Sequence, residues 1–165
     1  MTYGIDPGKS GAIVLLNRDG TVKATDPMPL EDADLGAYLS MIVDDSKKAD
    51  VWIERIPKYA GKAQSGSSVA TLFSNYRYIV GYLQGRGVNL QQVVPQVWMK
   101  PYRLQTEDWA MLTYPQRKKV LHEFALSEFF TDKENIPRQF ADAALIALHG
   151  HRMRCENQHT PTHTK

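Results

Sequence analysis

The sequence has few features that would tie the chain to a membrane or to an oxidising compartment. It contains one cysteine, Cys155, so no internal disulfide can form, and a reducing compartment, the cytoplasm, is expected. No apolar run approaches the roughly 18 residues that a membrane-spanning helix needs. The chain opens on a strand-like stretch with no charged and apolar leader before it, so neither a membrane anchor nor a secretory signal is expected.

A strong net charge is also missing. The formal charge of the 165 residues is +2 at pH 7, whereas nucleic-acid-binding domains are often more basic. The charges are unevenly placed, however, because residues 19–50 are acidic and most basic residues lie between 58 and 154. This asymmetry is compatible with one face that meets a polyanion, although many enzymes of other classes share it.

What the chain does contain is the composition of one globular domain. Hydrophobic residues make up 42% of the chain and charged residues 23%, and this length supports one core rather than two. We predict a folded domain over 1–150 and a polar, mobile tail over 151–165, because hydrophobic periodicity stops at Gly150. The histidines near that end follow no zinc-binding spacing.

Hydrophobic periodicity predicts an α/β chain with five strands. Strands are expected at 2–5, 11–16, 21–25, 51–56 and 88–94, and helices at 35–43, 69–84, 114–130 and from Pro137 onward. Short turns join the first three strands, which should form an antiparallel meander. The fourth strand follows a helix, so it should lie parallel to a neighbour in the same sheet.

The helix expected over 69–84 is apolar on two sides, since Tyr78, Ile79 and Tyr82 widen its main apolar stripe. One side should cover the sheet. The other side fits either a neighbouring element of the same domain or a second subunit, and the sequence does not choose between them.

Three carboxylates occupy positions where solvation alone would not place them. Asp6 ends the first strand, Glu54 ends the apolar run of the fourth, and Asp142 lies within an Ala/Leu-rich helix. If the two strands are adjacent and parallel, their ends lie about 4.8 Å apart, and the last helix would bring Asp142 to the same edge. Oxygen-only ligands favour Mg²⁺ or Mn²⁺, and two such ions about 4 Å apart activate a water and stabilise the leaving oxygen in phosphodiester hydrolysis.

Each carboxylate also has a plainer interpretation. Asp6 precedes Pro-Gly and fits a turn. Glu54 can pair with Arg55 at a strand end, and Asp142 can face solvent from its helix. The three together favour a metal site, because their order, strand context and helix context agree. A lysine or arginine filling the space between them would argue against it.

Four motifs resemble those of the RuvC-type Holliday-junction resolvases, nucleases of the RNase H-like superfamily. In chain order they are Gly4–Ala12 (GIDPGKSGA), Val51–Glu54 (VWIE), Val93–Lys100 (VVPQVWMK) and Ala141–Ala147 (ADAALIA). The third is similar to a stretch of the phage and chloroplast resolvases. The resemblance spans about residues 2–150, and its specificity lies in the four motifs occurring in order.

The resemblance implies an α/β fold of the RNase H-like type. Its five-stranded mixed sheet has the order 3-2-1-4-5, three antiparallel strands and then parallel ones, flanked by helices. It also implies a homodimer, formed through helix 69–84, that binds a four-way DNA junction and nicks two strands symmetrically. The implied cofactor is Mg²⁺ or Mn²⁺, two ions per active site, with no nucleotide cofactor.

The same resemblance assigns roles to single residues. Asp6, Glu54 and Asp142 carry over as metal ligands and catalytic residues, and Lys100 matches a catalytic lysine near the cleaved phosphate. The family generally has a fourth acidic or histidine ligand one turn before the helix aspartate. Here that region carries Gln139, which binds metal through its amide oxygen or leaves the place to a water. Either arrangement predicts weaker binding of one ion.

Further basic and aromatic residues are expected to meet DNA. A second catalytic cation of the family matches one of three neighbours, of which Lys118 is preferred, while Arg117 and Lys119 are assigned to DNA binding; a solvated helix face is the alternative. In the loop after the fourth strand, Lys58 and Lys62 are expected to contact phosphates. Tyr59 can stack on an exposed base or lie at a dimer rim.

Other functions stay open at this point. A debranching nuclease that cuts forks or flaps would use the same catalytic residues. A junction-binding protein with weak cleavage is compatible with the missing fourth ligand. A sugar-kinase or actin-like ATPase uses a similar first motif, but those proteins need two such domains around the nucleotide, and 165 residues are too few.

Overall fold

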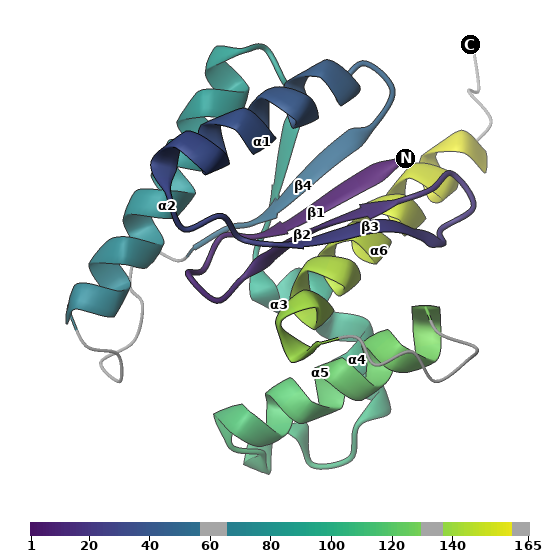
Figure 1. Cartoon of the computed structure of the whole chain (residues 1–165). Helices are drawn as coiled ribbons and strands as arrows, with labels where there is room; N and C mark the ends of the chain where they lie inside the picture. The colour runs from purple at the N-terminus through teal and green to yellow at the C-terminus, as the bar shows by residue number, and fades with distance from the viewer. Residues whose placement is uncertain (57–65, 130–136, 160–165) are drawn as a thin grey trace, which may run out of the picture.

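The computed structural model describes residues 1–56, 66–129 and 137–159, and shows one five-stranded sheet between two layers of helices (Figure 1). The strands are β1 (Thr2–Asp6), β2 (Ala12–Leu16), β3 (Val22–Pro27), β4 (Asp50–Glu54) and β5 (Leu90–Val93). The helices are α1 (Asp32–Asp45), α2 (Gly66–Gly85), α3 (Pro95–Trp98), α4 (Lys100–Gln105), the 3-10 turn η1 (Trp109–Met111), α5 (Tyr114–Phe129) and α6 (Arg138–His159). The predicted DNA contacts Lys58, Tyr59 and Lys62 lie outside the described residues.

The strand order β3-β2-β1-β4-β5 confirms the predicted topology. Short turns make β1, β2 and β3 antiparallel neighbours. Helix α1 returns the chain before β4, so β4 lies parallel to β1 with Ile53 opposite Ile5. Strand β5 lies parallel to β4 with Val93 opposite Glu54. The carboxyl ends of β1 and β4, which carry two of the three predicted carboxylates, therefore meet at one edge of the sheet.

The two faces of the sheet are covered by different helices (Figure 1). On one face, buried residues of α1 and α2 such as Leu39 and Leu83 pack against Ile5 and Ile53. On the other face, the small residues of α6 pack against Ala12, Val14 and Leu16 of β2. Alternation along each strand sends successive side chains to opposite faces, which explains the continuous apolar run of β2.

Helix α6 lies unusually close to β1, and Gly4 is the reason. A methyl group at Gly4 would overlap the carbonyl oxygen of Ala143 and the backbone nitrogen of Ala147. The alanine side chains of α6 between Ala141 and Ala147 are fully or almost fully buried, so they allow the helix to lie close to the sheet. This packing places Asp142, on the same turn of α6, at the sheet edge where β1 ends.

Helix α5 packs on α6 on the side away from the sheet (Figure 1). Its buried Leu121 and Ala125 join a cluster with Trp98, Tyr102 and residues of α6. The short helices α3 and α4 therefore belong to the same layer as α5. This layer faces the sheet edge at which Asp6 and Glu54 end.

The sequence prediction differs from the structure at several boundaries. The helix predicted at 69–84 begins earlier, at Gly66, and the predicted strand 88–94 shortens to Leu90–Val93. The helices between Pro95 and Met111 were not predicted, because they are too short to show a helical period.

The polar tail was predicted to begin at 151, but α6 continues to His159. Two ion pairs hold this polar helix end, from Arg152 to Glu128 at 2.8 Å and from Arg154 to Asp50 at 3.4 Å. Residues 160–165 lie outside the described ranges. Among the helices the structure describes, none combines the length and apolarity needed to cross a bilayer.

Candidate active site

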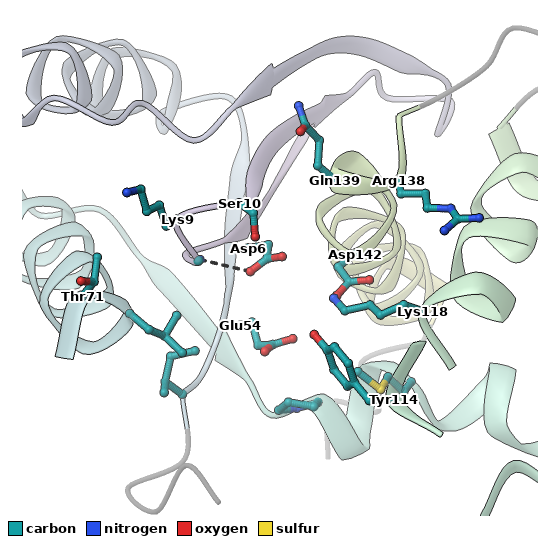
Figure 2. Close-up of a pocket in the computed structure, with 15 residues that line it drawn as sticks. Asp6, Lys9, Ser10, Glu54, Thr71, Tyr114, Lys118, Arg138, Gln139 and Asp142 are labelled. Carbon is teal, nitrogen blue, oxygen red and sulfur yellow. Dashed lines mark hydrogen bonds and ion pairs between the residues drawn. The ribbon is translucent and has the colours of Figure 1, made fainter. Parts of the chain in front are cut away.

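Asp6, Glu54 and Asp142 line one open cavity of about 1030 Å³ at the carboxyl edge of β1 and β4 (Figure 2). Asp6 and Glu54 end adjacent parallel strands, and Asp142 reaches the same space from α6. The Asp142 residue is 5% exposed, which excludes the alternative that it faces solvent. The structure therefore brings together the three carboxylates that the sequence singled out.

Asp6 is held by the turn that follows it. The backbone N–H of Gly8 donates a 3.2 Å hydrogen bond to Oδ1 of Asp6, and the N–H of Gly11 donates to the carbonyl of Gly8 at 2.8 Å. A side chain at Gly11 would overlap the backbone carbonyl of Asp6, so the turn depends on glycine there. Asp6 is therefore both a turn residue, as the plainer interpretation had it, and part of the cavity lining, because the turn orients its carboxylate toward the cavity.

Glu54 is held by a residue to which the sequence analysis gave no role. The indole N–H of the fully buried Trp98 donates a 3.0 Å hydrogen bond to Oε2 of Glu54. Trp98 lies on α3, which begins at Pro95 directly after β5, with proline at a position where its missing N–H costs nothing. The motif Pro-x-x-Trp was visible in the sequence, but its contact with a strand end 44 residues earlier was not.

Asp142 is paired with Lys118, which reaches the cavity from α5 (Figure 2). The Lys118 amine donates to Oδ2 of Asp142, and it lies 5.8 Å from the centre of the Tyr114 ring. Among the three candidate cations, the structure places the preferred Lys118 in the cavity. The Lys118 side chain is 38% exposed, so it enters from the solvent side.

The charges of the cluster are not balanced. Burial, with the nearby charge of Asp142, raises the pKa of Asp6 above its usual value. Burial, followed by the charges of Asp6 and Asp142, raises the pKa of Glu54 to about 8. Burial alone would lower the pKa of Lys118, but Asp142 and Asp6 raise it above its ordinary value. The raised pKa values show that ionising these neighbouring carboxyls together is unfavourable, and an added cation would stabilise their ionised forms.

The donor set fits a hard divalent cation, but it is not assembled as a closed ligand set. Among the described residues, no three His, Cys, Asp or Glu side chains form a group that would hold a metal ion. Lys118 occupies an oxygen of Asp142, and Trp98 occupies an oxygen of Glu54. The lysine thus stands within the space that the sequence analysis required to be open. A metal bound through Oδ2 of Asp142 would displace Lys118, whose partly exposed side chain has a flexible stem.

Other predicted residues fall in different places. Gln139 is exposed and lines the carboxylate cavity. Lys100 does not line that cavity; it lines a second hollow beside α4. Arg117 donates to the carbonyl of Ala110 at 3.1 Å, and Lys119 lies 3.7 Å from Glu123 on the exposed face of α5.

Several cavity residues were missed by the sequence analysis. Lys9 and Ser10 line the cavity from the turn after β1, Tyr114 from the start of α5, and Arg138 from the start of α6 (Figure 2). Lys9 and Ser10 lie inside the first motif, which was the available signal. Together with Lys118 they surround the carboxylates with groups that can donate to phosphate oxygens.

The comparisons with known proteins bear on the fold. No protein-family model matches the chain, and no curated protein matches its sequence. Thermus thermophilus RuvC in complex with a Holliday junction substrate matches with a TM-score of 0.61 and 14% identity, over 94% of this chain and 95% of that chain. A second Thermus thermophilus RuvC structure matches with a TM-score of 0.57 and 15% identity, over 94% and 96%.

The yeast mitochondrial Holliday junction resolvase Ydc2 matches with a TM-score of 0.54 and 14% identity, over 96% of this chain and 80% of that chain. The chain therefore has the fold of the RuvC-type resolvases over nearly its whole length. This confirms the RNase H-like fold that the motifs implied.

Proposed function

We propose that the chain is a divalent-metal-dependent endonuclease that resolves four-way DNA junctions by paired symmetric nicks. The observation that carries the proposal is the convergence of Asp6, Glu54 and Asp142, from β1, β4 and α6, in one open cavity. The likeness to solved junction resolvases supports it, since one of them is seen with a Holliday junction substrate. Neither observation alone would name the substrate.

Asp6, Glu54 and Asp142 would hold Mg²⁺ or Mn²⁺, two ions per site, with the amide oxygen of Gln139 as a further donor. The ions would supply Lewis acidity and a water activated at neutral pH. The chain's own residues position the groups, because the Gly8 N–H orients Asp6 and the Trp98 N–H orients Glu54.

Lys118 has two positions in this mechanism. Without metal it neutralises Asp142. If a cation held Asp142, the Lys118 ammonium, which also lines the cavity, would be free to donate to an oxygen of the reacting phosphate. Lys9 and Arg138, on opposite parts of the rim, would hold the flanking phosphates by charge (Figure 2).

Paired nicks require two active sites, so the proposal includes a homodimer through α2. Ile79 and Leu83 of α2 are buried in the core, while Tyr78 on the neighbouring side is 40% exposed. A dimer would cover that exposed side. Sedimentation of the free protein tests this part independently of cleavage.

Cleavage of a synthetic mobile four-way junction, with mapped cut positions, tests the function. Three-way, forked and linear DNA are compared side by side in Mg²⁺ or Mn²⁺. Asp6→Asn should abolish cutting, while Asp44→Asn, an exposed carboxylate on α1, should cut like the wild type. Preference for forks or flaps would favour a debranching nuclease. If the wild type binds the junction in chelator, but neither it nor any variant cuts in Mg²⁺ or Mn²⁺, the chain would be a junction-binding protein.

A further inference from the structure

We propose that a second hollow, lined by Lys100, Arg103 and Trp109, binds the sugar-phosphate backbone of the DNA beside the cut strand. The hollow has a volume of about 550 Å³ and lies between α4 and η1. The inference rests on the nuclease function proposed above. It moves Lys100 from the reaction centre to a neighbouring binding site.

The two hollows share one turn of chain. Pro95 and Met99 line the carboxylate cavity, whereas Gln96 and Lys100 line the second hollow. Side chains four residues apart lie on one face of a helix, so the two pairs point to two sides of the α3 turn. Trp98, in the same turn, is fully buried and bonded to Glu54, which fixes the orientation of the turn. The second hollow therefore lies on the other side of the same turn from the carboxylate cavity, within reach of DNA that flanks a strand bound at the carboxylates.

The second hollow has cations without acidic partners. Lys100 and Arg103 are both exposed and lie three residues apart on α4, so their side chains share a face. In the part of the chain that the structure describes, the ion pairs use other cations, and neither of these two is within 4.0 Å of a carboxylate. Asp108 lines the same hollow but offsets one charge at most. A net positive site remains for an anionic partner.

The rest of the lining suits a nucleic-acid backbone. Arginine offers a planar fork to phosphate oxygens, and lysine offers a mobile point charge. Gln96 and Thr106 add neutral polar groups of the kind that bind phosphate and sugar. Trp109 forms an aromatic part of the wall, and Arg117 lies 5.9 Å from the centre of its ring. An aromatic wall beside cations fits a deoxyribose or an unstacked base, without sequence preference.

Inside the carboxylate cavity, Lys118 is the cation paired with a carboxylate. Lys100 lies on the other side of α3, so it contributes affinity for the DNA rather than charge at the reacting phosphate. This separation predicts different consequences for binding and for cutting.

The test measures junction binding in chelator, where no cutting occurs. Fluorescence anisotropy of a labelled four-way junction is recorded at several salt concentrations for the wild type and for K100A/R103A. The double variant should bind roughly 10–100-fold more weakly and lose about two units of salt slope, since two phosphate contacts are removed. The control K47A/K48A removes the same charge from the turn before β4, at the opposite end of that strand from Glu54, and should bind like the wild type.

Unchanged affinity and salt slope in K100A/R103A, with a wild-type melting temperature, would overturn the inference. Normal binding with lost cutting would also overturn it, because Lys100 would then act at the reacting phosphate. Failure of the wild type and K47A/K48A to bind any branched DNA would instead remove the proposed function itself.

Discussion

Trp98 and Glu54 are 44 residues apart in the chain, and the indole N–H of Trp98 donates a 3.0 Å hydrogen bond to Oε2 of Glu54. The indole is fully buried, so its polar edge has a fixed direction. One oxygen of Glu54 is thereby held while the side chain still lines the cavity. A donor placed in this way orients a carboxylate before any cation arrives.

Trp98→Phe keeps an aromatic ring but removes the N–H. Loss of a partner that orients a metal ligand typically costs about 10–100-fold in metal affinity or activity. We expect a loss of that size in Mn²⁺ affinity, measured by titration calorimetry. Trp52→Phe is the matched control. Trp52 lies on β4, the strand that carries Glu54, and it packs edge-on against His149, with 5.3 Å between the ring centres. Equal Mn²⁺ affinity in Trp98→Phe and the wild type would contradict the orienting role.

Lys118→Met separates the two roles of the lysine. Without the ammonium, Asp142 is a buried carboxylate with no counter-ion, so the chelated protein should lose about 1–3 kcal/mol of stability, allowing for the exposure of Lys118. Mn²⁺ should bind more tightly than in the wild type, because it no longer competes with the lysine, while cutting should fall. Weaker Mn²⁺ binding in Lys118→Met would show that the lysine does not compete with metal. Asp142→Asn/Lys118→Met should recover the stability.

Gln139→Glu restores a carboxylate near the position where the resolvases carry a fourth ligand. Gln139 is exposed and lines the cavity, so the substitution should not disturb the core. We expect a lower Mn²⁺ concentration for half-maximal junction cutting, because a charged oxygen binds a hard cation more strongly than an amide oxygen. Gln116→Glu, on the first turn of α5, is the control for the added charge. An unchanged Mn²⁺ requirement would place the fourth donor elsewhere.

The pKa of Glu54, raised to about 8 by burial and by its acidic neighbours, predicts a pH dependence of stability. Between about pH 5 and pH 8 the folded chain keeps a proton that the unfolded chain has released. Stability of the metal-free protein should therefore fall as the pH rises through this window. Urea unfolding in chelator measures it. Glu54→Gln, which does not titrate, should flatten the dependence, and an equally steep fall in that variant would assign it to other groups.

Gly4→Ala tests the close packing that positions Asp142. The added methyl overlaps the backbone of α6, so the helix must move away from β1. We expect a loss of about 1–3 kcal/mol or more, together with weaker Mn²⁺ binding. At Gly85, a Cβ would meet nothing within 4 Å, and Gly85→Ala should leave the melting temperature unchanged or slightly raised. A wild-type melting temperature for Gly4→Ala would show that α6 tolerates the shift.

The sheet and its carboxylates could be predicted because they depend on local patterns. Apolar runs and short turns specify the meander, and a helical connection specifies the parallel strand that follows. Once β1 and β4 are neighbours, Asp6 and Glu54 must end at the same edge. Asp142 followed from an alanine-rich helix that can lie close to the sheet. These patterns lie within a few residues along the chain, whereas the adjacency of β1 and β4 was implied by the resemblance to the RuvC-type resolvases.

The rest of the site depends on contacts between elements that are remote in sequence. Whether Lys118 or its neighbours enters the cavity depends on the rotation of α5 against α6, which no motif specifies. The placement of Lys100 outside the cavity depends on the one-turn helix α3, which is too short to show a period. The sequence motifs were sufficient to predict the fold and the three acidic residues. The partners of these residues could not be predicted, because hydrogen bonds and ion pairs over a few ångströms form only when the helices are packed in place.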